Sequence, residues 1–224
     1  MNIMQFQKRI GYFFKDSELL KRAFTHSSYA NEHNTQSYER LEYLGDAIVD
    51  FLIGEYLFNN FPSLNEGMMS RVRASLVCEK ALSELATEIG IDSYMLLGNG
   101  AKQSGEGKRP SILADMFEAH IAAMYLDAGL DNTREYLISL YGDRINNAVS
   151  SKELIDYKSK LQETLQENGA CNILYELVSS EGPVHHCLFE MQVTADGKVL
   201  GTGSAYSKKE AQQRAAENAL NNLG

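Results

Sequence analysis

The sequence predicts a protein of two domains that differ in fold class: an all-α domain over residues 1–147, then an α+β domain over residues 154–224 with the order α-β-β-β-α. Two observations lead to this expectation. The apolar periodicity of the first part lapses in the polar stretch 146–152, which indicates a short linker. Beyond that stretch, strand-like runs separated by turn residues lie between two helical segments. Each part is long enough to bury a core of its own.

The first domain is organised around an acidic helix that begins near Glu39. Glu39, Glu42 and Asp46 lie within roughly 60° of one another on a helix that turns about 100° per residue, so they share one face. No Lys or Arg stands three or four residues away on that face to relieve the repulsion. A solvated acidic face is the common alternative and stays open. The opposite, apolar face is formed by Leu41, Leu44, Ile48, Phe51 and Leu52.

A second acidic pair lies in the apolar run 111–126. Asp115 and Glu118 are spaced i, i+3, so they share one face of a helix that is otherwise apolar enough to be central in the domain. An isolated ionised carboxylate there would cost several kcal/mol of desolvation unless it were compensated. If the two acidic helices pack side by side, their carboxylates come together as hard oxygen ligands of the kind that hold Mg²⁺ or Mn²⁺. Such a site is suited to phosphoryl chemistry.

The motifs around these acids resemble those of bacterial ribonuclease III. The acidic helix 39–49 is preceded by 25–29 (THSSY) and followed by 66–74 (EGMMSRVRA) and by the second acidic segment 111–118. The resemblance covers nearly the whole chain, because the C-terminal third is similar to the double-stranded RNA-binding domain of that family. It implies that the first domain is a ribonuclease III catalytic domain and the second a double-stranded RNA-binding domain.

The composition indicates a globular, cytoplasmic protein without a membrane partner. The N-terminus lacks the apolar core of a secretory signal, and no charge-free run approaches the roughly 20 residues that a membrane span needs. Cys78, Cys171 and Cys187 are widely spaced and form no CxxC pair. Neither a disulfide framework nor a zinc site is therefore predicted.

The net charge of −9 argues against a broadly basic RNA-binding surface. Residues 152–224 carry 7 Lys and Arg against 10 Asp and Glu, a net charge of −3, and the rest of the chain carries 14 against 20, a net charge of −6. Any RNA binding must therefore rest on local basic patches and on metal ions that offset the carboxylates.

Segments on either side of the acidic helix leave alternatives open. His26, Ser27 and Ser28 suggest a hydrolase triad, but no Gly-x-Ser-x-Gly elbow is present, and neighbours in sequence do not have triad geometry. We interpret His26 as structural support beside the acidic helix. Glu66 lies in the stretch 61–67, whose Pro and Gly indicate a connecting loop. It could reach the acidic cluster as a sixth carboxylate, or be an ordinary acid at a helix N-terminus.

The Gly-rich stretch 97–110 is expected to be a loop. It is not a phosphate-binding P-loop, because Glu106 occupies the position that the Lys of that motif requires. No nucleotide cofactor is therefore expected. Lys102, Lys108 and Arg109 could touch an RNA backbone, although a solvated loop is the commoner outcome.

The second domain starts with a helix that ends at Asn168 and Gly169, and three strand-like runs follow. Gly182 lies in the turn between the first two runs, and Asp196 and Gly197 mark a tight hairpin between the second and third. A last helix begins at Ser207. The predicted strands span residues 173–179, 186–193 and 199–206.

The start of the last helix indicates a site for RNA phosphates. Ser207 and Glu210 have the spacing of a capping box, and Lys208 and Lys209 stand between them in the first turn. Helix amides and two ammonium groups together favour an anion, such as the phosphates that face each other across an A-form major groove. Two solvated lysines are the alternative.

The resemblance adds contacts with the minor groove. It implies that the first helix of the RNA-binding domain, through Ser159, Gln162 and Glu163, and the loop that ends at His185 each reach a minor groove. Short polar side chains and a histidine can read 2′-hydroxyls there, so duplex shape would be recognised more than base sequence. A metal site around His185 is a weak alternative, because no fourth ligand has the spacing.

The resulting hypothesis is a Mg²⁺-dependent endoribonuclease that hydrolyses phosphodiester bonds in double-stranded RNA, with Mn²⁺ able to replace Mg²⁺. The resemblance implies a homodimer that leaves 5′-phosphates and short 3′ overhangs and processes precursors of ribosomal RNA and of some messenger and transfer RNAs. Glu39 and Glu66 are expected to support the acidic site. The predicted metal ligands are Glu42, Asp46, Asp115 and Glu118, with Asp46 and Glu118 as the catalytic pair.

Two other functions compete with this hypothesis. A regulator that binds duplex RNA but has lost catalysis is disfavoured because every acidic position is present. A di-iron carboxylate protein would need Glu-x-x-His on paired helices, and Glu118 and His120 have the wrong spacing for it.

Overall fold

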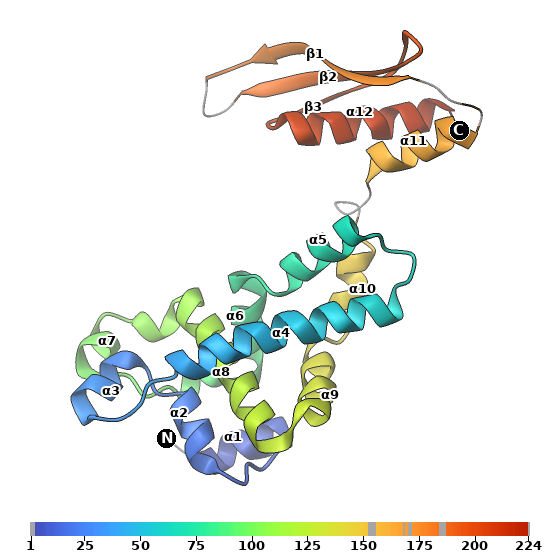
Figure 1. Ribbon diagram of the computed structural model, residues 1–224. Helices are drawn as coiled ribbons and strands as arrows, with labels where there is room; N and C mark the ends of the chain where they lie inside the picture. The colour runs from blue at the N-terminus through green and yellow to red at the C-terminus, as the bar shows by residue number, and fades with distance from the viewer. Residues whose placement is uncertain (1–2, 152–155, 168, 170–171, 184–186, 224) are drawn as a thin grey trace. The chain divides into compact units, whose positions relative to one another are not determined.

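The computed structural model describes residues 3–151, 156–167, 169, 172–183 and 187–223. The chain forms two units, Met1–Leu154 and Ile155–Gly224. The described part of the first unit is helical, and the second combines two helices with a three-stranded sheet (Figure 1). The predicted fold class, an all-α domain followed by an α-β-β-β-α domain, is confirmed.

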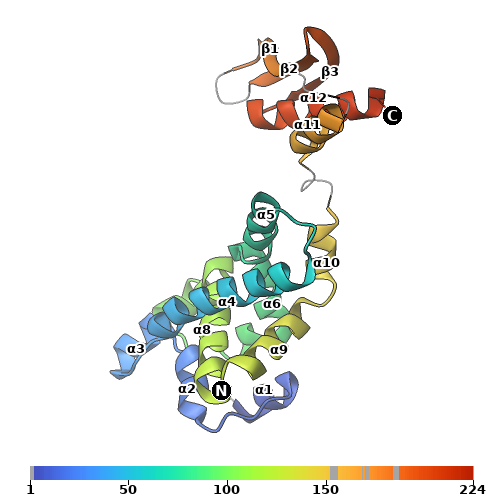
Figure 2. The same ribbon diagram turned by 45° about the vertical axis from the view of Figure 1, so that its right-hand side comes forward.

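The helical unit is built around α8 (Pro110–Ala128), which packs against α4 (Glu39–Asn60) and α6 (Glu79–Ile89). Buried side chains lie on nearly all sides of α8, as expected of a central helix. Figures 1 and 2 both show α4 lying across α8. The other helices of this unit are α1 (Ile3–Ile10), α2 (Ser17–Ala23), α3 (Ser27–His33), α5 (Glu66–Leu76), α7 (Asn99–Gln103), α9 (Leu130–Tyr141) and α10 (Arg144–Val149), with 3₁₀ turns at Ile91–Ser93 and Glu106–Lys108.

Capping side chains explain where several helices begin. The Asp16 side chain accepts the backbone N–H of Glu18 at the start of α2, and Asn65 Oδ1 accepts the N–H of Met68 at the start of α5. Pro110 occupies the first turn of α8, where its missing N–H has no intrahelical partner to lose. This start places Asp115 and Glu118 within the first three turns of α8.

Two expectations about irregular segments are wrong. The polar stretch 146–152 does not begin as a linker, because α10 continues to Val149, with Ile145 2% exposed and Ala148 packed against the core. Ile145, Ala148 and Val149 are spaced i, i+3 and i+4, a helical pattern that the intervening asparagines obscure. The Gly-rich stretch is also partly helical, since it contains α7 and the turn Glu106–Lys108.

The second unit contains α11 (Tyr157–Glu167), β1 (Ile173–Glu181), β2 (Leu188–Ala195), β3 (Lys198–Ala205) and α12 (Lys208–Leu223). The strands are antiparallel in the order β1-β2-β3, and both helices pack on one face, where Leu161, Val193 and Ala215 are fully buried together. Asp196 and Gly197 have φ values of 49° and 80°, as a type I′ hairpin requires. The predicted hairpin is confirmed, and the strands differ from their predicted ends by one or two residues.

Within the described part of the chain, no helix has both the length and the apolarity needed to span a membrane.

Candidate metal centre

Carboxylates from two helices meet on the surface of the helical unit. Glu42 comes from α4, and Asp115 and Glu118 come from α8. One oxygen atom from each of the three side chains lies within 4.8 Å of the other two, and all three residues are partly buried. The two acidic helices therefore pack side by side, as the sequence predicts, and three of the five predicted carboxylates form one donor set.

The close approach of the two helices depends on Gly45, which lies in α4 one turn from Glu42. A Cβ atom built at Gly45 would overlap the backbone oxygen of Glu118. Glycine in a helix interior is unfavourable by roughly 0.5–1 kcal/mol relative to alanine, so this position calls for a packing reason. The absence of a side chain lets α4 and α8 touch backbone to backbone at the acidic site.

The arrangement is electrostatically unfavourable without a cation. Burial, and then the charges of Asp46, Asp115 and Glu42, raise the pKa of Glu118 from its ordinary value of 4.5 to about 8. The pKa of Glu42 is also raised, first by burial and then by the neighbouring carboxylates. A bound cation would reverse these shifts by favouring the ionised forms.

Asp115 has a hydrogen-bonding partner that the sequence analysis missed. Burial raises its pKa, while a hydrogen bond from the hydroxyl of Tyr38 to Oδ2, 3.2 Å long, lowers it. Burial and the nearby carboxylates in turn raise the pKa of the Tyr38 phenol. The phenol therefore stays protonated and acts as a donor.

The other predicted acids on α4 lie at the edge of this donor set. Asp46 is exposed, and after burial its charge is the largest influence on the pKa of Glu118. Glu39 is also exposed, and its Oε2 accepts a hydrogen bond from the Ser37 hydroxyl at 2.7 Å. Among the described residues, Asp46 and Glu39 surround the cluster without joining its three closest members.

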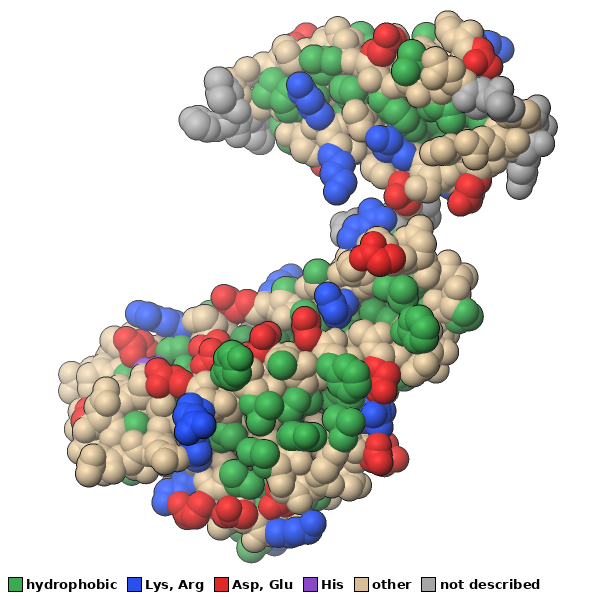
Figure 3. Space-filling model, viewed as in Figure 1, with side chains coloured by type: hydrophobic (Ala, Val, Ile, Leu, Met, Phe, Trp, Pro, Cys, Tyr) green, Lys and Arg blue, Asp and Glu red, His purple; other side chains and the backbone are tan. Residues whose placement is uncertain are grey.

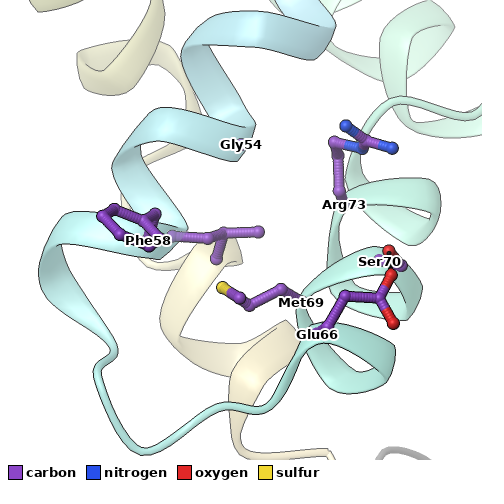
Figure 4. Close-up of a pocket in the computed structure, with 7 residues that line it drawn as sticks. Gly54, Phe58, Glu66, Met69, Ser70 and Arg73 are labelled. Carbon is purple, nitrogen blue, oxygen red and sulfur yellow. Dashed lines mark hydrogen bonds between the residues drawn. The ribbon is translucent and has the colours of Figure 1, made fainter.

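Glu66 lies elsewhere within one copy of the chain. It is in the first turn of α5, and its Oε1 accepts a hydrogen bond from the Ser70 hydroxyl at 3.0 Å. With Phe58, Met69 and Arg73 it lines a hollow of about 190 Å³ between α4 and α5 (Figure 4). Within one copy of the chain, Glu66 is therefore better described as an acid at the N-terminus of α5 than as a sixth carboxylate of the cluster.

Two further acids near the site escaped the sequence analysis. Glu79, at the start of α6, contributes to the raised pKa of Asp115, and Asp50 contributes to that of Glu118. Asp50 continues the acidic face of α4 one turn beyond Asp46, so helical spacing could have identified it. No local pattern could have identified Glu79, because its approach depends on how α6 packs against α8.

The THSSY segment is joined by hydrogen bonds to the segment before α7. The His26 side chain accepts the N–H of Ser28 and caps α3, and the Ser28 hydroxyl accepts the N–H of Gly98 at 2.9 Å. The backbone N–H of His26 donates to Leu96 O. These bonds join α3 to the segment before α7, and they agree with the structural interpretation of His26.

His120 points into the core rather than toward the cluster. It is fully buried against Phe6, Phe14 and Phe24, and burial lowers its pKa to about 3. Its Nε2 lies 3.1 Å from the hydroxyl of Tyr136. It is therefore a neutral core residue, and this position gives no support to a di-iron site.

In the second unit, predicted RNA contacts from two helices line one hollow. Ser159 and Gln162 of α11 and Lys209 of α12 border a hollow of about 460 Å³. Lys158 joins the two helices, because its Nζ donates to Gln212 Oε1 at 2.8 Å and lies 4.4 Å from the centre of the Tyr175 ring. The fold thus sets the spacing between the α11 face and the start of α12.

The remaining predicted RNA contacts are placed as follows. Glu163 and Lys208 are exposed, on α11 and at the start of α12. Ser207 Oγ accepts the N–H of Glu210 at 3.2 Å, which is the N-cap half of the predicted capping box. His185 lies outside the described residues.

Comparison with known proteins gives a family match for each unit. A family model described as ribonuclease-III-like matches residues 16–145, and a model of the double-stranded RNA binding motif matches residues 157–223. Ribonuclease 3 of Bacillus cereus (strain G9842) is 44% identical over 221 residues, which cover 97% of this chain and 90% of that protein.

Solved structures resemble the chain as well. The nuclease domain of ribonuclease III from Campylobacter jejuni, described for flexibility in a region involved in dimer formation, is 37% identical with a TM-score of 0.59. It matches 62% of this chain and 95% of that one. Dicer from Pichia stipitis is 29% identical with a TM-score of 0.50, over 93% of this chain and 95% of its own.

The raised pKa of Glu118 predicts how metal-free stability depends on pH. Between pH 4.5 and about 8 the folded protein holds a proton on Glu118 that the unfolded chain releases, so the free energy of unfolding falls as pH rises through this window. Glu118→Gln cannot ionise. We expect it to match the parent near pH 5 and to exceed its stability by about 1–2 kcal/mol above pH 8, after allowance for solvent screening.

Thermal or urea unfolding in EDTA across this pH range measures the difference. Glu135→Gln on α9, which is exposed, makes the same chemical change away from the cluster and should leave the pH profile unaltered. Parallel profiles for Glu118→Gln and the parent would contradict the electrostatic account.

Proposed function

The chain belongs to the ribonuclease III family, and on that basis we propose that its nuclease uses Mg²⁺ and processes precursors of ribosomal RNA and of some messenger and transfer RNAs in the cytoplasm. Membership confirms the resemblance that the motifs predict. The protein is a ribonuclease III type endoribonuclease whose second domain binds double-stranded RNA. The alternative of a catalytically silent RNA-binding regulator finds no support in the acidic site, which retains all its predicted carboxylates.

The observation that carries the proposal is the set of carboxylates shared by α4 and α8. The family implies a divalent metal ion, and oxygen donors from Glu42, Asp115 and Glu118 within 4.8 Å of one another suit a hard cation. The raised pKa of Glu118 marks a repulsion that such a cation would relieve. Mg²⁺ matches an all-carboxylate set, and Mn²⁺ would fit the same ligands.

We assign the residues of the site as follows. A bound Mg²⁺ would supply a Lewis acid for the scissile phosphate and lower the pKa of a coordinated water. Glu118 must lose the proton that it holds in the metal-free protein before it can act as a ligand. Asp46, exposed beside Glu118, completes the metal and catalytic set on the solvent side, where a duplex can approach. Glu39, which borders the donor set, takes a supporting role, and the products carry 5′-phosphates and short 3′ overhangs.

We also propose that the enzyme is a homodimer. Tyr43, Phe51 and Phe58 are exposed by 84%, 51% and 70%, and their spacing puts them on one side of α4. Figure 3 shows hydrophobic side chains gathered on the helical unit, with acidic side chains beside them. A large exposed apolar surface rimmed by charge is typical of a protein interface. The Campylobacter jejuni nuclease domain is described as having a region involved in dimer formation, which supports a homodimer here.

For the RNA-binding domain we propose two kinds of contact. Ser159, Gln162 and Glu163 on α11, together with His185, would touch minor grooves through 2′-hydroxyls. Lys208 and Lys209, exposed at the N-terminus of α12, would contact phosphates. The hollow shared by Ser159, Gln162 and Lys209 supports this arrangement, because it joins both kinds of contact on one surface.

The catalytic assignment predicts that Glu118→Gln loses cleavage but keeps duplex binding. Metal-ion stabilisation of a transition state contributes several kcal/mol, so loss of this ligand should slow cleavage of a long RNA duplex at least about a hundredfold. Binding should persist, because the contacts in the second domain remain. Cleavage is followed with and without Mg²⁺ on gels, and Glu135→Gln is the matched control. Cleavage at the parent rate by Glu118→Gln would refute the assignment.

The phosphate assignment predicts that replacing both Lys208 and Lys209 with Ala weakens duplex binding to a similar degree for all sequences. The slope of log affinity against log salt should fall by about 2, since each lysine releases roughly one counterion. Titration of metal-free protein with two duplexes of different sequence measures both quantities. Lys198→Ala, at the exposed start of β3, is the control. An unchanged salt slope, or a loss confined to one sequence, would exclude phosphate contacts.

A further inference from the structure

The Tyr38 side chain holds one oxygen of a predicted metal ligand. Its hydroxyl donates to Oδ2 of Asp115 across 3.2 Å, although the two residues are 77 positions apart in sequence. A carboxylate without such a bond turns freely about its last torsion, which is broad and roughly two-fold. The hydrogen bond restricts this torsion and engages Oδ2, while the other carboxylate oxygen keeps its own capacity to accept or to bind a cation.

Tyr38 is itself held firmly. It is the N-cap residue of α4, its backbone N–H donates to Thr25 O at 2.9 Å, and its backbone oxygen accepts the N–H of Glu42 at 2.9 Å. The side chain is 5% exposed, and its ring lies 5.9 Å from the ring of His26. Its hydroxyl therefore has little freedom to leave Asp115.

The position of Tyr38 links both halves of the donor set. The same residue starts the helix that carries Glu42, four residues on, and hydrogen-bonds the ligand on α8. Residues outside the ligand shell that hydrogen-bond metal ligands in this way fix ligand orientation, and their loss typically lowers metal affinity or activity 10- to 100-fold.

We propose that Tyr38 is a positioning residue for the metal site, which orients the Asp115 carboxylate toward the ion through the hydroxyl bond to Oδ2. The inference rests on the proposed function, because it presupposes that Asp115 is a ligand. It adds to that function a residue without a negative charge, which acts through its hydrogen bond to Asp115. The aromatic ring supplies packing, and the hydroxyl supplies the orientation.

The test is Tyr38→Phe, which removes the hydroxyl and keeps the buried ring. The matched control is Tyr12→Phe, because the Tyr12 hydroxyl donates to Asp127 Oδ2 at 2.6 Å in the same unit. Asp127 is nine residues after Glu118 on α8, about 14 Å along the helix axis. The control therefore breaks a tyrosine–aspartate hydrogen bond away from the cluster.

Binding of Mn²⁺ and of Mg²⁺ to the full chain without RNA is measured by calorimetry and by the rise of the melting temperature with metal. We expect Tyr38→Phe to weaken metal binding roughly tenfold or more and to raise the Mg²⁺ concentration needed for half-maximal cleavage by a similar factor. Its metal-free melting temperature should fall no further than that of Tyr12→Phe, because each variant loses one tyrosine–aspartate hydrogen bond. Its duplex affinity in EDTA should match the parent. Tyr12→Phe should keep the metal affinity of the parent.

Three other results would contradict either the role of Tyr38 or the proposed metal site. Parent-like metal affinity in Tyr38→Phe overturns the positioning role while leaving the metal centre intact. Equal weakening in Tyr12→Phe overturns it too, since the effect would then come from general loosening of the domain. If the parent protein itself binds neither metal, the proposed function fails first and the role of Tyr38 falls with it.

Discussion

The backbone contact between α4 and α8 at Gly45 brings the acidic site together. With no side chain at that position, the backbone of Glu118 can lie directly against α4, and Glu42 and Asp115 then approach within the distance a single ion can span. Any larger residue would separate the helices at the level of the carboxylates. The second domain carries the double-stranded RNA binding motif, but the proposed chemistry depends on this one close approach in the first domain.

The contact between α4 and α8 also brings like charges together, and the resulting repulsion must be offset by the apolar core. Partly buried carboxylates repel one another, as the raised pKa of Glu118 records, while apolar side chains from α4, α6 and α8 form one continuous core beneath them. In the metal-free protein, apolar packing therefore stabilises the two helices, while repulsion between the carboxylates destabilises them. Binding of a divalent cation and ionisation of the ligands are then linked, so affinity for metal should rise with pH.

The acidic helix faces and the turn and capping signals could be predicted from the sequence, because each depends on residues that are close together along the chain. The acidic faces of α4 and α8, the Asp196–Gly197 hairpin and the capped start of α12 all follow from residues within one or two turns of each other. The partnership of Tyr38 with Asp115 could not be predicted, because it depends on how distant segments pack. The helix α10 was missed for a different reason: its few apolar residues lie among asparagines in a stretch of weak periodicity.

We propose that Glu42, Asp115 and Glu118 hold a divalent cation. Anomalous diffraction from crystals of the parent protein soaked in Mn²⁺ would locate the ion without reference to activity. We expect an anomalous peak about 2.1 Å from an oxygen of each of these side chains, with Asp46 nearby. Mn²⁺ bound only elsewhere on the molecule, with the three carboxylates turned apart, would contradict it.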